Sequence, residues 1–159
     1  MEKQLDINVE ERVKRAQAYF KAGYNCAQAV VMAFDDVMQM LPDELARLAA
    51  PFGGGMGRMR EVCGTVSGMA FLAGDIKPSA NPNNLEERKE NYALVQLFAD
   101  KFREENGDIV CRRLLGLEPV AERAETAMPS ERTSEYYRKR PCSEYVGCAA
   151  RIVAEYLTK

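Results

Sequence analysis

Residues 52–68 read FGGGMGRMREVCGTVSG, and the structure of this stretch decides the fold class. It contains six glycines and one cysteine between two apolar stretches. Such a run is typical of a phosphate-binding loop in an α/β protein, of a close contact between two backbones, or of a loop that presents a reactive sulfur. The rest of the chain distinguishes these three interpretations.

A nucleotide-binding loop does not fit this stretch. A P-loop needs Lys followed by Ser or Thr at a fixed position after its glycines, and that pair is missing. Counted from either Gly53 or Gly55, the last glycine position of the dinucleotide-binding pattern holds an arginine. The β-strand that precedes that pattern is missing as well. The α/β interpretation is therefore rejected.

The apolar segments follow helical periodicity, and no segment alternates like a β-strand. Asn8 and Asn25 are typical N-caps, and Pro42 suits the first position of a helix. The sequence therefore predicts a single all-α domain over residues 1–159, an irregular bundle of five to six helices. Residues 117–140 are predicted to be a polar surface segment. Predicted helices span residues 9–22, 26–40, 42–50, 61–74, 85–106 and 143–159, with a short helical turn at 111–116.

Composition and charge exclude several classes of protein. The net charge is −2 and Lys and Arg form no dense patch, which argues against a nucleic-acid partner. No apolar run approaches the ~18 residues of a membrane span. The first fifteen residues lack the apolar core of a signal peptide, so a cytoplasmic location is expected.

The chain has no histidine, so the usual base at neutral pH and imidazole ligation of a metal are excluded. Sulfur, carboxylate, tyrosine and lysine remain for chemistry. There are five cysteines, and in a reducing cytosol they are expected to be thiols rather than permanent disulfides. They are Cys26, Cys63, Cys111, Cys142 and Cys148.

Four of the cysteines fall near predicted helix starts. Cys26 follows the N-cap Asn25, and Cys63 is expected in the first helical turn after the glycines. Cys111 and Cys142 likewise stand near the start of a predicted helix. The positive end of a helix stabilises a thiolate, as in reactive cysteines. Cys148 lies on the apolar stripe of the last helix and is predicted to be a core residue.

The glycine run permits backbone conformations that direct amide groups at an anion or a thiolate. Gly54, Gly55 and Arg58 are the residues expected to hold such a group, together with Gly64 at the start of the following helix. Gly64 and Gly68, four residues apart, lie on one helix face and allow another backbone to approach closely.

Four stretches, GYNCAQAV, FGGGMGRMREVCGTVSG, NGDIVCRRLLG and PCSEYV, follow one another in this order. With them the chain resembles the C_GCAxxG_C_C family of redox-active proteins over almost its whole length. That family has four cysteines and a CGAxxG motif, which residues 63–68 match except that Thr65 replaces the usual alanine. The resemblance implies that the cysteines act together at positions Cys26, Cys63, Cys111 and Cys142. Cys148 has no counterpart in the family.

Three functions remain open. In the first, Cys63 is the nucleophile of thiol–disulfide chemistry and Cys26 resolves the mixed disulfide. In the second, Cys26, Cys63, Cys111 and Cys142 are ligands of an iron–sulfur cluster or of zinc, although their wide spacing contains no CxxC pair. In the third, the chain is a helical interaction module whose cysteines only pack. The partner is a redox protein or a small-molecule substrate, and a homodimer remains open.

Overall fold

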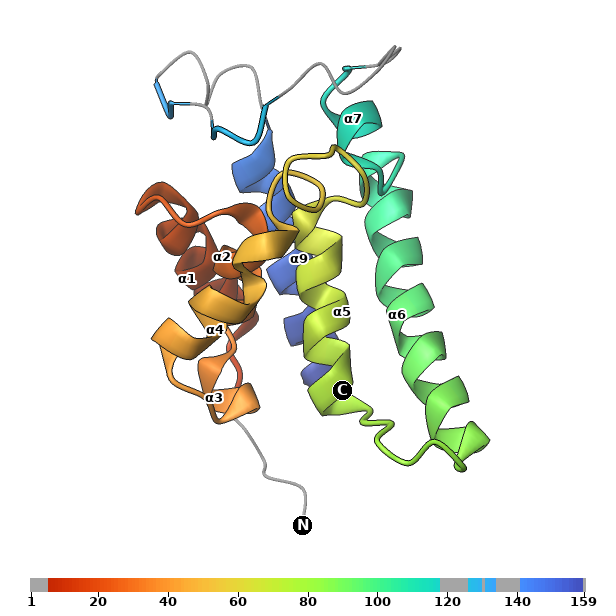
Figure 1. The fold of residues 1–159 in the computed structure, drawn as a ribbon. Helices are drawn as coiled ribbons and strands as arrows, with labels where there is room; N and C mark the ends of the chain where they lie inside the picture. Colours follow the sequence, from red (N-terminus) through yellow and green to blue (C-terminus); the bar gives the residue numbers. More distant parts are fainter. Residues whose placement is uncertain (1–5, 118–125, 130, 134–140, 159) are drawn as a thin grey trace.

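The computed structural model describes residues 6–117, 126–129, 131–133 and 141–158, and within them the protein is helical, with no β-strand. The predicted all-α irregular bundle is confirmed (Figure 1). The predicted polar segment at 117–140 lies largely outside the described residues. The helices are α1 Val9–Lys21, α2 Cys26–Met32, α3 Asp35–Met38, α4 Pro42–Ala49, the 3₁₀ turn η1 Ala50–Phe52, α5 Gly64–Ile76, α6 Leu85–Asn106, α7 Cys111–Leu114 and α9 Cys142–Leu157.

Side-chain caps define where the helices begin. The Asn8 carboxamide oxygen accepts from the Glu11 amide at 3.0 Å at the start of α1. At α2, Asn25 and Gln28 form a reciprocal capping box, in which each side chain accepts from the other's backbone amide at 2.9 Å. The caps predicted from the sequence at these two asparagines are therefore confirmed, and Pro42 occupies the first position of α4.

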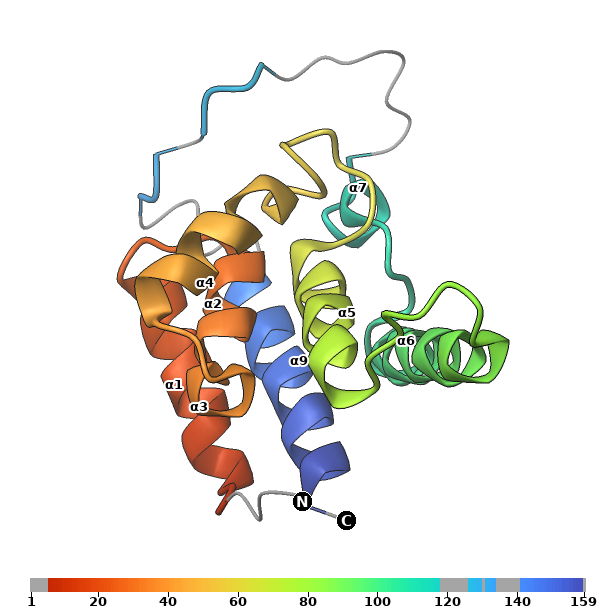
Figure 2. The same ribbon diagram turned by 60° about the horizontal axis from the view of Figure 1, so that its bottom comes forward.

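Helix α2 lies at the centre of the bundle. It packs against α1, α4, α5 and α9, and five of its seven residues are buried. Helix α1 runs along α9, and α5 separates α2 from the long helix α6 (Figure 2). None of the described helices combines the length and the apolar character needed to cross a membrane.

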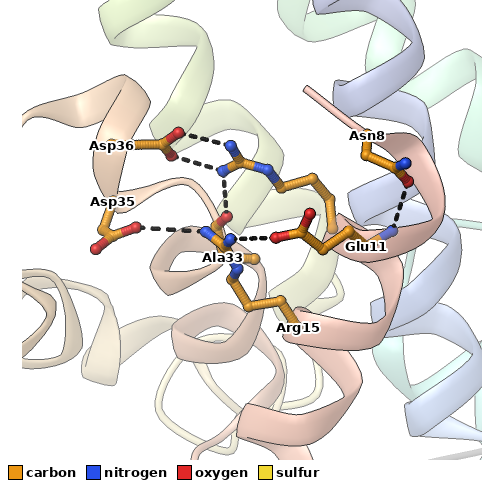
Figure 3. A network of polar contacts seen from close by, with 7 residues as sticks. Asn8, Glu11, Arg15, Ala33, Asp35 and Asp36 are labelled. Carbon is orange, nitrogen blue, oxygen red and sulfur yellow. Dashed lines mark hydrogen bonds and ion pairs between the residues drawn. The ribbon is translucent and has the colours of Figure 1, made fainter. Parts of the chain in front are cut away.

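One predicted helix, residues 26–40, is wrong as a single element. The chain leaves the helical conformation at Phe34, where φ is −122°, and resumes as the short helix α3. The reason is Arg12 of α1, which donates to the Ala33 carbonyl at 2.8 Å and forms two contacts of 2.6 Å with the Asp36 carboxylate (Figure 3). The Arg12 side chain is only 4% exposed. A buried guanidinium thus stabilises the break between α2 and α3.

We expect Arg12→Met to lower the free energy of unfolding by about 2–3 kcal/mol, because it leaves the Asp36 carboxylate and the Ala33 carbonyl without this donor. Arg12 lowers the pKa of Asp36 chiefly by hydrogen bonding to the carboxylate. Because the folded-state pKa is depressed, the contribution is present above the unfolded pKa and is lost as the pH falls. The difference from wild type should therefore shrink below about pH 4.

Urea unfolding at several pH values measures this difference. Arg15→Met is the matched control, since the Arg15 side chain is 33% exposed and pairs with Glu11 on the helix surface. Its effect should stay within about 0.5 kcal/mol. Equal effects of the two substitutions would show that the buried pair has no special role.

Candidate redox site

The cysteines singled out by the sequence all stand at helix starts. Cys26, Cys111 and Cys142 are the first residues of α2, α7 and α9. Cys63 is the residue immediately before α5. The predicted helix at 61–74 therefore begins later than expected, at Gly64. Residues 61–63 instead pair through their backbone with another segment of the chain.

That partner is the segment that leads into α7. Val62 and Val110 form an isolated antiparallel bridge. The Cys63 amide donates to the Ile109 carbonyl at 2.7 Å, and the Cys111 amide donates to the Glu61 carbonyl at 2.6 Å. In such a pair Cys63 and Cys111 lie on the same face as diagonal neighbours, for which Cα atoms are about 7–8 Å apart. The end of the glycine loop thus brings these two cysteines together beside α5 (Figure 1).

Two glycines make room for two cysteines. A Cβ atom at Gly64 would lie 2.4 Å from the Cys26 sulfur and 2.9 Å from the Phe52 carbonyl oxygen. A Cβ atom at Gly55 would lie 2.7 Å from Cβ of Cys111, and the φ of this residue is +71°. Neither position accepts a side chain without displacing its neighbours. Gly64 therefore holds the sulfur of Cys26 against the start of α5, next to Cys63.

The four cysteines line one cavity. About 60 Å³ of it is open to the centres of water molecules, which suits a few small atoms but no large ligand. Two aromatic residues and two arginines also line this cavity: Phe20, Tyr145, Arg60 and Arg132. The Tyr145 hydroxyl donates to the Leu114 carbonyl at 3.4 Å. The predicted convergence of Cys26, Cys63, Cys111 and Cys142 is therefore found.

The prediction that Cys63 has a lowered pKa is wrong. The side chain is buried, 6% exposed, and burial raises the pKa of its thiol. Negative charge on Cys26 raises that pKa further, whereas the Thr65 hydroxyl, 3.0 Å from the Cys63 sulfur, opposes the effect. A position at the start of a helix does not outweigh the cost of charging a sulfur without water. Cys26 and Cys142 are only half-buried.

The second half of the glycine loop uses its amides within the loop. The amides of residues 56–61 donate to carbonyls of residues 51–56. Gly54 lines the cysteine cavity, and Gly55 and Gly64 contact cysteines as described above.

The two arginines of the loop point to different places. The Arg58 guanidinium donates to the Thr126 carbonyl at 2.8 Å and lines a neighbouring cleft instead of the cavity. Arg60 places its positive charge beside Cys111, because its guanidinium lies 3.7 Å from the Cys111 sulfur. Arg60 itself is buried, 7% exposed.

Cys148 lies apart from the cavity, as expected, but in a polar setting. Its thiol donates to a Glu105 carboxylate oxygen at 2.7 Å, and the Asn106 side chain donates to its sulfur at 3.4 Å. Burial and the hydrogen bond to Glu105 raise the pKa of Cys148 to about 11. The predicted apolar core position is therefore only partly right, because the half-buried thiol links α9 to two polar residues of α6, Glu105 and Asn106.

A shared metal ion does not fit the arrangement. In the part of the chain that the structure describes, no group of three or more cysteine, aspartate or glutamate side chains is placed to hold a metal ion. No step through an iron–sulfur cluster or zinc is derived from this geometry.

Sequence reasoning missed three residues of the cavity. Tyr145 follows Cys142 by three positions, and this spacing places both on one face of α9. Burial, and then negative charge on Cys63, raises the pKa of Tyr145. Phe20 and Arg132 come from α1 and from the polar segment before α9, and no motif marks either one.

Taken together, the fold and the site define a helical protein built around a small cavity lined by four thiols. A family model described as "Putative redox-active protein (C_GCAxxG_C_C)" matches residues 24–156. The chain belongs to this family. A comparison of this chain with curated proteins and with solved structures found no significant match.

We expect Gly64→Ala to destabilise the protein by about 2 kcal/mol or more, because the added methyl group meets a sulfur and a carbonyl oxygen that have little room to move. Gly74→Ala is the matched control on the same helix, since a Cβ atom there has no neighbour within 4 Å. It should stabilise the helix by about 0.5–1 kcal/mol. Thermal or urea unfolding of both variants compares them. Equal effects would contradict the close contact.

The buried Cys63 should be slow to react in the reduced protein. Its raised pKa keeps it protonated at pH 8, and each unit above the pH lowers the thiolate fraction about tenfold. Iodoacetamide labelling followed by peptide mass spectrometry at pH 6–11 measures the pH at which each cysteine reacts. Thr65→Val should move the Cys63 transition to higher pH and leave that of Cys148 unchanged. Labelling of Cys63 at pH 7 at the rate of a free thiol would contradict the assignment.

Proposed function

We propose that this protein carries out thiol–disulfide exchange with the cysteines of its cavity, using Cys26 to attack and Cys63 to resolve. The observation that carries the proposal is the position of the Cys26 sulfur, which lies against Gly64 beside Cys63, within a cavity that all four cysteines line. The family description, a redox-active protein, supports the same class of chemistry. A reducing compartment such as the cytoplasm suits a protein that works with free thiols.

The order of attack reverses the one expected from the sequence. Cys26 is half-buried, whereas Cys63 is buried and its pKa is raised. The more accessible sulfur meets a substrate first. A substrate bonded to Cys26 places the mixed disulfide beside Cys63, where Cys63 can attack it.

The proposed exchange has two steps. The Cys26 thiolate attacks one sulfur of a disulfide RSSR, the S–S bond breaks, and RS⁻ leaves with the electron pair. The Cys63 thiolate then attacks the Cys26 sulfur of the mixed disulfide and releases the second RS⁻. The two protons of the protein thiols end on the two RS⁻ groups. A dithiol reductant restores the protein by the reverse exchange.

Cys111 and Cys142 are the other two cysteines that line the cavity. Cys111 is a diagonal neighbour of Cys63 across the Val62–Val110 bridge, and the Arg60 guanidinium favours its thiolate. We propose that the Cys111 thiolate attacks Cys63 in the Cys26–Cys63 disulfide, so that a Cys63–Cys111 disulfide forms and Cys26 leaves as a thiolate. Cys142 lines the same cavity from the start of α9 and is the fourth thiol of the set.

Disulfide mapping tests the proposed order. Reduced protein is treated with one equivalent of bis(2-hydroxyethyl) disulfide, quenched in acid, alkylated and analysed by peptide mass spectrometry. In the wild type we expect Cys63 to be disulfide-bonded to Cys26 or, after exchange, to Cys111. In Cys26→Ser we expect no disulfide among the cavity cysteines, because the attacking thiol is missing. In Cys63→Ser the mixed disulfide on Cys26 should accumulate, because its resolving partner is missing.

Cys148→Ser is the control and should form the same disulfide as wild type. Failure of all cavity cysteines to form a disulfide would favour the interaction module whose cysteines only pack. Iron or zinc bound stoichiometrically to protein purified without air would instead favour the metal-ligand alternative.

A further inference from the structure

A second cleft adjoins the cysteine cavity. About 350 Å³ of it is open to the centres of water molecules, within the size range of small-molecule sites. It shares four lining residues with the cavity, so the two spaces are contiguous. The shared residues are Asn25, Gly54, Arg60 and Arg132.

The cleft is lined by cations. Its described lining residues include three arginines, Arg58, Arg60 and Arg132. Three guanidinium groups around one space make it favourable for a carboxylate or a phosphate.

The backbone holds two of these arginines in a strained conformation. Arg58 and Arg60 have φ values of +67° and +61°, which non-glycine residues rarely adopt and which cost of order 1 kcal/mol or more each. Met56 between the loop glycines has a φ of +65°. Hydrogen bonds within the loop maintain this conformation, which directs both guanidinium groups toward the cleft and the cavity.

The third arginine is fixed from the opposite side. Arg132 donates to the carbonyls of Phe20 and Tyr24 at the end of α1, and its guanidinium stacks over the Phe20 ring at 4.2 Å. It therefore lies between the cleft and the cavity as a fixed charge. A ligand that fills both spaces would place an anionic group in the cleft and a neighbouring group beside the thiols.

We propose that the substrate is a low-molecular-weight disulfide that carries an acidic group, bound by the arginines of the cleft with its S–S bond toward Cys26. This inference rests on the proposed thiol–disulfide function and names the substrate class for it. The bond exchange is the one described above, in which the anionic disulfide is reduced to two thiols and the protein dithiol is oxidised.

The test compares three disulfides of similar size but different charge, so that the effect of charge on the exchange rate can be measured apart from intrinsic reactivity. They are 3,3′-dithiodipropionate, which is anionic, bis(2-hydroxyethyl) disulfide, which is neutral, and cystamine, which is cationic. The rate of each with the reduced protein is divided by its rate with free 2-mercaptoethanol under the same conditions. We expect the normalised rate of the anion to exceed that of the neutral disulfide about tenfold, and the cation to be slowest.

Arg58→Gln should slow the anionic disulfide more than the neutral one and so reduce this preference to about twofold, since Arg58 lines the cleft but not the cavity. Arg103→Gln is the matched control, an exposed arginine of α6 that lines neither space. Higher salt should weaken the preference in wild type. Equal normalised rates for the anionic and neutral disulfides, or an equal effect of Arg58→Gln on both, would overturn the proposal.

A binding measurement separates this proposal from the proposed function. Suberate matches 3,3′-dithiodipropionate in length but has no S–S bond, and calorimetry measures its affinity for Cys26→Ser and for Cys26→Ser with Arg58→Gln. We expect binding that Arg58→Gln weakens severalfold. Disulfide exchange without suberate binding would overturn the acidic substrate and leave the proposed function standing. Suberate binding without exchange of any disulfide would overturn the substrate assignment together with the proposed function.

Discussion

The contact between Gly64 and the sulfur of Cys26 fixes how the central helix meets α5. A Cβ atom at position 64 would lie 2.4 Å from this sulfur, and one turn later a Cβ atom at Gly68 would lie 3.1 Å from Cβ of Val30. Two glycines on one face thus allow α2 and α5 to approach closely over two turns. Because α2 also contacts α1, α4 and α9, the rest of the bundle is arranged around this contact. The same close approach puts the Cys26 thiol beside Cys63. The lack of a side chain at Gly64 is therefore needed both for the packing of α2 on α5 and for the position of the two thiols.

The glycine loop fixes the positions of Cys63 and Cys111 relative to each other. Its amides donate to its own carbonyls, and it accepts left-handed conformations at three non-glycine residues. The backbone pairing of residues 61–63 with 109–111 contributes to offsetting the cost of that strain. A nucleotide-binding loop keeps its amides available for phosphate. This loop uses the amides of residues 56–61 to hold its own shape.

The sequence predicts the helices and the meeting of the four cysteines well, because both depend on local signals and on a recognisable motif. Asn8 and Asn25 cap the helices that their residue types indicate. The break at Phe34 was missed because it depends on Arg12, which is distant in sequence. The pKa of Cys63 was predicted in the wrong direction for a related reason. The helix start is visible in the sequence, whereas the burial that outweighs it arises only when α2, α5 and the loop pack together.

Cys63 and Cys148 show why a raised pKa has different consequences at the two sites. Burial is the first cause in both. At Cys148 the next cause is a hydrogen bond to Glu105, a fixed carboxylate that also pairs with Arg151, so the thiol stays protonated whatever happens elsewhere. At Cys63 the next cause is the charge of Cys26, a neighbouring thiol of the same cavity. Burial limits the reaction of Cys63 with reagents in solution, whereas the resolving role that we propose requires Cys63 to reach only a mixed disulfide on the adjacent Cys26.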